Sequence, residues 1–147
     1  VLVPNMPDRG VKADYSWLKG QIPDGNLQKI QAAATDRPQA HQTWLIQARN
    51  LKKLSDAGVR IALGTDGNTP WAPHVEMADM VAAGMTPSQV IVAATKNGAE
   101  FLRIANTGTI ANGMIADLIV LDANPIENIT NTRKINAVYL RGTLVPR

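Results

Sequence analysis

Residues 59–66 most constrain the fold, and they read Val-Arg-Ile-Ala-Leu-Gly-Thr-Asp. A short run of β-branched and apolar residues is typical of a buried strand. This run ends on a glycine, a hydroxyl and a carboxylate, and it follows a helix-like stretch that stops at Gly58. Helix, glycine and strand form one step of an α/β fold, so we expect an α/β architecture.

Asp66, at the end of this predicted strand, is the first candidate functional residue. In α/β barrels and doubly wound sheets, side chains at the carboxyl ends of parallel strands point into the active-site mouth. The alternative is that Asp66 only caps the loop or helix that follows, as aspartate often does. The local pattern leaves both interpretations open.

Helix signals surround this strand. Residues 5–25 form a long loop rich in Pro, Gly, Asp and Asn, and a short helix is expected over 27–34. An apolar stripe at helical spacing predicts a long helix up to Gly58, with Asp36 as its N-cap and Pro38 in its first turn. After Asp66 we expect a helix with Met77, Met80 and Val81 facing inward, then a capping box at residues 86–89 that starts another helix, closed by residues 99–104.

From about residue 106 the character changes to short strands separated by turns. These strands are expected at residues 107–110, 116–121, 137–141 and 143–145, after residues 1–3 as the tail of an earlier strand. Aromatic content is only 4%, so the core must rest on aliphatic residues and methionine.

Composition excludes several kinds of site. The chain has no cysteine, which rules out disulfides, thiolate nucleophiles and cysteine-based zinc sites, and suits a cytoplasmic location. It has no apolar run of about 18 residues, so no membrane-spanning segment is expected. The net charge is +3 and the basic residues are scattered, without the dense basic and aromatic stripe that nucleic-acid binding requires.

Several segments, taken in order, resemble the amidohydrolase superfamily, nearest to its imidazolonepropionase-like and prolidase-like branch. The family usually has a lysine directly after the glycine that matches Gly113. Here that position is Met114, at what we expect to be a surface turn. The segments that carry the resemblance are 57–66, 73–77, 83–87, 94–100, 108–113, 116–125 and 138–142.

The resemblance implies a (β/α)₈ barrel that holds one or two divalent metals. The family's ligands are a His-x-His pair, often a carboxylated lysine, two further histidines and the aspartate that ends the last strand. This chain has only His41 and His74, and only Asp66 matches a ligand position. The resemblance therefore implies a C-terminal portion: residues 1–105 from the barrel domain, with about its last two strands, and residues 106–147 from the accessory β domain.

The implied activity is hydrolysis of amide, cyclic amide or ester bonds in a small-molecule substrate. In the complete enzyme a divalent metal, expected to be zinc, would activate water, while Asp66 would bind the metal and pass the water's proton to the leaving group. One carboxylate does not hold a catalytic ion, so the other ligands must come from other segments or another copy.

His74 is the second candidate catalytic residue. It opens a helix just beyond Asp66, so it can reach the mouth to bind substrate or a transition-state oxygen; alternatively it is only hydrogen-bonded locally. Asn68 and Trp71 are candidates for substrate binding. The residues interpreted as structural are His41, Trp44, Glu76 and Asp117.

Two other functions stay open. Two strands cannot close a barrel of eight, so the exposed edges predict a homo-oligomer, and the chain can be a catalytically silent fragment that self-associates. The other is a small metal-independent esterase that uses Asp66 and His74. The hydroxyl group that such an esterase uses with these two residues would come from Thr65, Ser16 or Ser55.

Overall fold

The structure is a computed structural model that describes residues 9–65 and 69–146. The chain divides into two compact units, with the boundary between residues 49 and 50. Each unit is described by itself. Asp66, Asn68 and the strand predicted at residues 1–3 lie outside the described residues.

The first unit holds the 3₁₀ helix η1 (Ser16–Leu18), α1 (Asp24–Ala33) and most of α2 (Pro38–Asp56). The predicted helix over 27–34 thus begins three residues earlier, at Asp24. Gln31 on α1 holds the preceding loop in place, because its Oε1 accepts from the backbone N–H of Tyr15 (2.8 Å) and its Nε2 donates to the carbonyl of Ala13 (2.9 Å).

Trp44 and Ala48 form the buried stripe of α2, as the helical spacing predicted. The His41 ring stacks on Trp44 with centroids 5.9 Å apart, and its Nδ1 contacts the carbonyl oxygen of Arg9 at 2.6 Å. Gly10 is required here, because a Cβ at this position would collide with the backbone of His41, and its φ of +66° disfavours other residues. His41 therefore anchors the loop before α1.

The core of the second unit lies among α3 (Ala72–Ala82), α4 (Pro87–Ala94) and the 3₁₀ helix η2 (Ile129–Arg133). The predicted capping box is confirmed: the Thr86 hydroxyl accepts from the Gln89 N–H, and the Gln89 side chain accepts from the Thr86 N–H. The core is aliphatic and rich in methionine, as composition predicted. Its buried members are Met77, Met80, Met85, Val90, Ala93 and Ile129.

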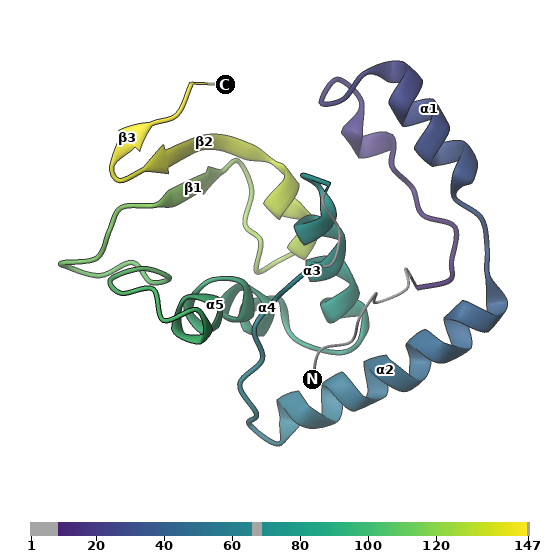
Figure 1. Cartoon of the computed structure of the whole chain (residues 1–147), viewed down its shortest axis with the longest axis horizontal. Coiled ribbons are helices and arrows are strands. Elements are labelled where there is room, and N and C mark those ends of the chain that lie inside the picture. Colours follow the sequence, from purple (N-terminus) through teal and green to yellow (C-terminus); the bar gives the residue numbers. More distant parts are fainter. Residues whose placement is uncertain (1–8, 66–68, 147) are drawn as a thin grey trace. The chain divides into compact units, whose positions relative to one another are not determined.

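The C-terminal part forms an antiparallel sheet of order β1-β2-β3 (Figure 1). Its strands are β1 (Leu118–Leu121), β2 (Ile135–Leu140) and β3 (Thr143–Leu144). Leu118 pairs with Tyr139, which in turn pairs with Leu144. These strands match the last three predicted ones.

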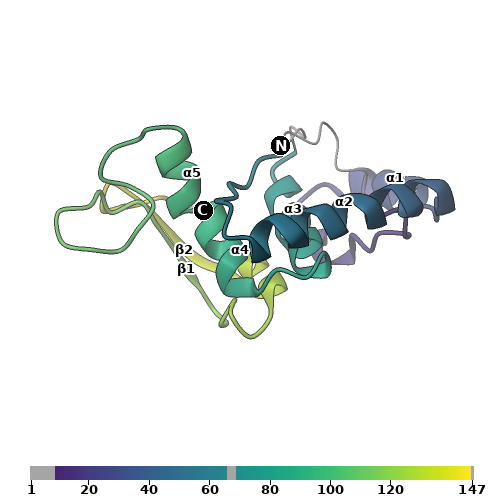
Figure 2. The same cartoon turned by 90° about the horizontal axis from the view of Figure 1, so that it is seen from below.

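Between α5 (Lys96–Phe101) and β1 the chain is irregular, and both views show it projecting beyond α5 (Figures 1 and 2). The strand predicted at residues 107–110 is wrong. Gly108 adopts φ +82°, which interrupts an extended run, and it lies against α5 rather than against a strand.

The strand predicted over residues 59–63 is also wrong: residues 59–65 are irregular. A strand is defined by hydrogen bonds to a neighbouring strand, and the described part of the chain gives this segment none. The segment contacts a helix instead, since the Leu63 N–H donates to the carbonyl of Ala93 in α4 over 3.0 Å. The prediction of a buried segment also fails in part, because Ile61 and Leu63 are only partly buried against the core and Val59 is 49% exposed.

Candidate functional site

The candidate site is the start of α3, because Asp66 and Asn68 fall outside the described residues. Trp71 is the N-cap residue of α3 and is partly buried. Its carbonyl accepts from the N–H groups of His74 (3.1 Å) and Val75 (3.3 Å), while Pro73 occupies the first turn, where no N–H is needed. The sequence therefore fixes where α3 begins, and with it the place of Trp71 and His74.

His74 projects from this first turn toward η2, where its Nδ1 lies 3.1 Å from the hydroxyl oxygen of Thr132. Burial lowers the pKa of His74 below its ordinary value, and the positive charge of Arg133 lowers it further. The imidazole is therefore mostly neutral at pH 7. This bond joins residues 58 positions apart, so the interpretation of His74 as bonded only within its own helix start is wrong.

Thr132 is held by the geometry of η2. The Asn128 side chain caps this helix by accepting from the N–H of Thr130 (2.9 Å). Residues three apart lie on the same side of a 3₁₀ helix, so Ile129 and Thr132 face inward together, 5% and 7% exposed. The Thr132 hydroxyl donates to the Ile129 carbonyl over 2.8 Å. No local signal in the sequence marked Thr132 as a site residue.

Glu76 and Asp79 follow His74 on α3. Burial raises the pKa of Glu76 to about 7, with a further contribution from the negative charge of Asp79, three residues along the helix. Asp79 is only 4% exposed. A carboxyl group with a pKa near 7 can give or take a proton at neutral pH. The structural interpretation of Glu76 missed this property, because the sequence does not show how deeply a helix face is buried.

The described residues do not complete a metal site. Within residues 9–65 and 69–146, no three histidine, aspartate or glutamate side chains come together in a way that would hold an ion. A catalytic zinc needs about three protein ligands. The described side chains thus do not fit a resident metal by themselves.

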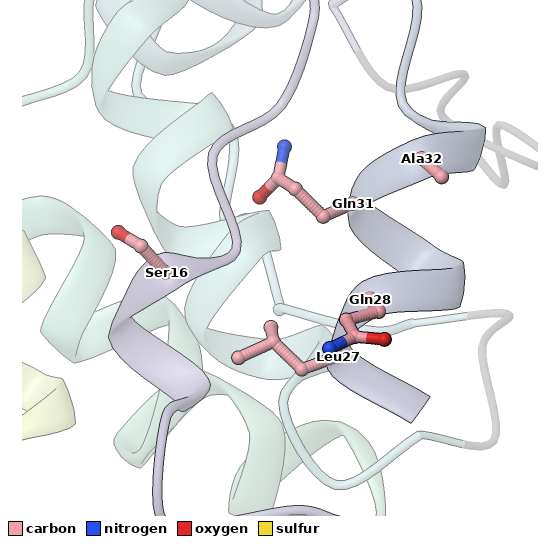
Figure 3. Close-up of a pocket in the computed structure, with 5 residues that line it drawn as sticks. All are labelled: Ser16, Leu27, Gln28, Gln31 and Ala32. Atoms are coloured by element: carbon pink, nitrogen blue, oxygen red, sulfur yellow. The ribbon is translucent and has the colours of Figure 1, made fainter. Parts of the chain in front are cut away.

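The pocket of about 400 Å³ in the first unit is a different kind of feature (Figure 3). It lies between η1 and α1, and its walls are mostly apolar. Its hydroxyl belongs to Ser16, which donates to Asp14 over 3.0 Å, and the Gln31 amide is already bonded to backbone. Nothing in it resembles an activated nucleophile.

A model of the amidohydrolase family matches residues 20–145. The chain belongs to the amidohydrolase family. An imidazolonepropionase from Streptomyces coelicolor is 34% identical over 105 residues, covering 66% of this chain and 26% of that protein. A 5-methylthioadenosine/S-adenosylhomocysteine deaminase from Thermococcus sibiricus is 38% identical over 97 residues, or 54% of this chain and 23% of that protein.

Solved structures that superpose on this chain agree with the family match. A Xaa-Pro dipeptidase with bound methionine superposes with a TM-score of 0.62 at 29% identity, covering 89% of this chain and 32% of that chain. Aspergillus niger ochratoxinase gives a TM-score of 0.61 at 32% identity, covering 84% of this chain and 27% of that chain. These neighbours indicate a fold of the TIM-barrel type.

The chain spans about a quarter of the length of the curated relatives it matches. Those relatives are hydrolases that act on small molecules. In the part of this chain that the structure describes, no helix has both the length and the apolar character needed to cross a membrane.

Proposed function

We propose that this chain is the C-terminal portion of a metal-dependent hydrolase of amide, cyclic amide or ester bonds. The observation that carries the proposal is the family match over residues 20–145, together with the coverage of only about a quarter of each relative. In this proposal residues 1–105 belong to the barrel domain, with about its last two strands and their helices. Residues 106–147 belong to the accessory β domain.

Asp66 is the proposed metal ligand and proton carrier of the complete enzyme. Amidohydrolases generally use a divalent metal, which we propose is zinc here, and which would activate the attacking water. Because the described residues do not assemble a ligand set, the remaining ligands would come from chain outside these 147 residues or from another copy. His74 would contact the substrate, and Asn68 and Trp71 would line its pocket.

The test compares the 147-residue chain with the protein encoded by the complete reading frame that contains it. Hydrolysis of amides and activated esters is measured with and without a chelator. We expect turnover from the complete protein, loss on adding the chelator, and a fall of at least roughly 10³-fold for Asp66→Asn.

Asp56→Asn is the matched control, because Asp56 is an exposed acid at the end of α2 that pairs with Lys52. It should leave turnover unchanged. Full turnover by Asp66→Asn would overturn the proposal. Chelator-resistant turnover of esters would favour the metal-independent esterase with Asp66 and His74.

A silent, self-associating fragment is the second candidate, and exposed apolar side chains favour it. Phe101 is 77% exposed, Leu102 65% and Ile110 91%. Large contiguous apolar surfaces are uncommon on monomers. We therefore propose that the chain alone forms homo-oligomers. Size-exclusion chromatography with light scattering tests this, and a monomer at micromolar concentration would contradict it.

A further inference from the structure

The hydroxyl of Thr132 lies between two partners, the carbonyl oxygen of Ile129 at 2.8 Å and the Nδ1 of His74 at 3.1 Å. A hydroxyl has one hydrogen to donate, and a carbonyl can only accept. Two oxygens 2.8 Å apart repel unless a hydrogen lies between them, so the Thr132 hydrogen points to Ile129. Toward His74, Thr132 can then only accept, which places a hydrogen on Nδ1.

This hydrogen decides what the other nitrogen of His74 can do. A neutral imidazole carries one N–H, and the bond made by one ring nitrogen selects the state of the other. Burial and Arg133 keep the ring neutral at pH 7 by lowering the pKa of His74. With hydrogen on Nδ1, Nε2 carries the lone pair and is an acceptor or a base.

We propose that Thr132 is a positioning residue for His74: it holds the ring in the Nδ1–H tautomer, so that Nε2 carries the lone pair. Thr132 reaches α3 from η2, in the C-terminal segment that precedes β2. In the proposed division this segment belongs to the accessory β domain. Through Thr132 it would therefore set the tautomer of His74, a residue of the barrel portion.

The tautomer narrows the role of His74 in the proposed function, on which this step rests. A neutral ring with its lone pair on Nε2 cannot donate from that nitrogen to a transition-state oxygen, which was one of the roles expected for His74.

The experiment is ¹⁵N NMR of the 147-residue chain labelled at histidine, near pH 8, where His74 is neutral because its pKa is lowered. Long-range ¹H–¹⁵N correlations distinguish the protonated nitrogen from the one with the lone pair. The chain has only two histidines, so His41→Gln assigns the spectrum. His41 is an internal control, since its Nδ1 contacts a carbonyl at 2.6 Å and must carry its own hydrogen.

We expect the Nδ1–H pattern for His74 in the unsubstituted chain and in Thr132→Ser, which retains the hydroxyl. In Thr132→Val we expect the ratio of Nδ1–H to Nε2–H to fall roughly fivefold, the loss of one hydrogen bond, with the His41 signals unchanged. An Nε2–H pattern in the unsubstituted chain would overturn the proposal. So would an unchanged His74 pattern in folded Thr132→Val.

If Thr132→Val does not fold, the unsubstituted chain and Thr132→Ser still decide the tautomer. The measurement needs no turnover, so a failure of the proposed hydrolase activity and a failure of this inference are separate results.

Discussion

Asn97, the second residue of α5, donates through Nδ2 to the carbonyl oxygen of Ile61 over 2.8 Å, across 36 positions of the sequence. Two residues further along the same segment, the Leu63 N–H donates to the carbonyl of Ala93 over 3.0 Å. These two bonds attach residues 59–65 to α4 and α5, where the sequence predicts a strand paired with its neighbours. The chain that leads to Asp66 is therefore held by helices.

We expect Asn97→Ala to lower the free energy of unfolding by roughly 1–3 kcal/mol, because it leaves the partly buried carbonyl of Ile61 without this donor. Urea denaturation measures the change. Asn136→Ala is the matched control, since Asn136 donates over the same 2.8 Å but to the carboxylate of Asp122 on the exposed surface. Its cost should stay within about 0.5 kcal/mol. Equal costs for the two variants would contradict a special role for Asn97.

Asp117 offers a second test of a long-range bond. Its carboxylate accepts from the Arg141 N–H over 2.7 Å, at the turn between β2 and β3, where Arg141 adopts φ +50°. Asp117→Ala should cost about 1 kcal/mol, because a charge-assisted bond to a strained turn is lost. Asp117→Asn should recover at least half of that cost, since an amide oxygen can still accept. Equal midpoints of urea unfolding for the two variants would show that the side-chain oxygen does not matter.

The sequence predicted the helices well because their signals are local. Thr86 and Gln89 form a reciprocal cap within four residues, and Gly84 adopts φ +104° where the preceding helix was expected to end. The apolar spacing of Met77 and Met80 placed both in the core. Each of these interactions lies within one turn of helix, so a single sequence is enough to show it.

The site was only partly predictable, because its contacts are long-range. His74 was found from its position after Asp66, but its partner Thr132 is 58 residues away and has no motif around it. Glu76 was recognised only as a favourable charge near a helix start. Its burial depends on how α3 packs, which the apolar pattern of one helix does not determine. The prediction of a paired strand at residues 59–63 failed for the same reason, because strand pairing depends on contacts with distant segments.

The raised pKa of Glu76 predicts a specific dependence of stability on pH. The ordinary pKa of 4.5 applies to the unfolded chain, and the pKa in the folded chain is about 7. Between these two values the folded state holds the proton more tightly, so the free energy of unfolding falls as the pH rises through this window. Below pH 4.5 both states are protonated and no loss is expected. Above about 7 the loss is complete.

Glu76→Gln should remove this loss. We expect the variant to be more stable than the unsubstituted chain by roughly 1–2 kcal/mol near pH 8, less than the full shift corresponds to, because the side chain is partly exposed. Near pH 4.5 the two should converge. Urea denaturation at both pH values measures this, with Glu127→Gln, at an exposed surface carboxylate, as the control. A stability difference that is the same at both pH values would count against a protonated Glu76.

Two glycines in the irregular segment after α5 allow steric crowding to be separated from backbone strain. Gly108 and Gly113 have nearly the same φ, +82° and +83°. A Cβ at Gly108 would lie 2.8 Å from the Cβ of Ala99 and 3.0 Å from the Cα of Lys96, whereas a Cβ at Gly113 would meet nothing within 4 Å. Gly113→Ala should therefore cost only the strain of a left-handed alanine, about 1 kcal/mol.

Gly108→Ala should cost more, roughly 2–4 kcal/mol, because the backbone must also move away from α5. Thermal unfolding monitored by circular dichroism measures both variants, and the difference between them reports the contact between residue 108 and α5. If the segment did not pack against α5 in solution, the two substitutions would lower the midpoint by the same amount.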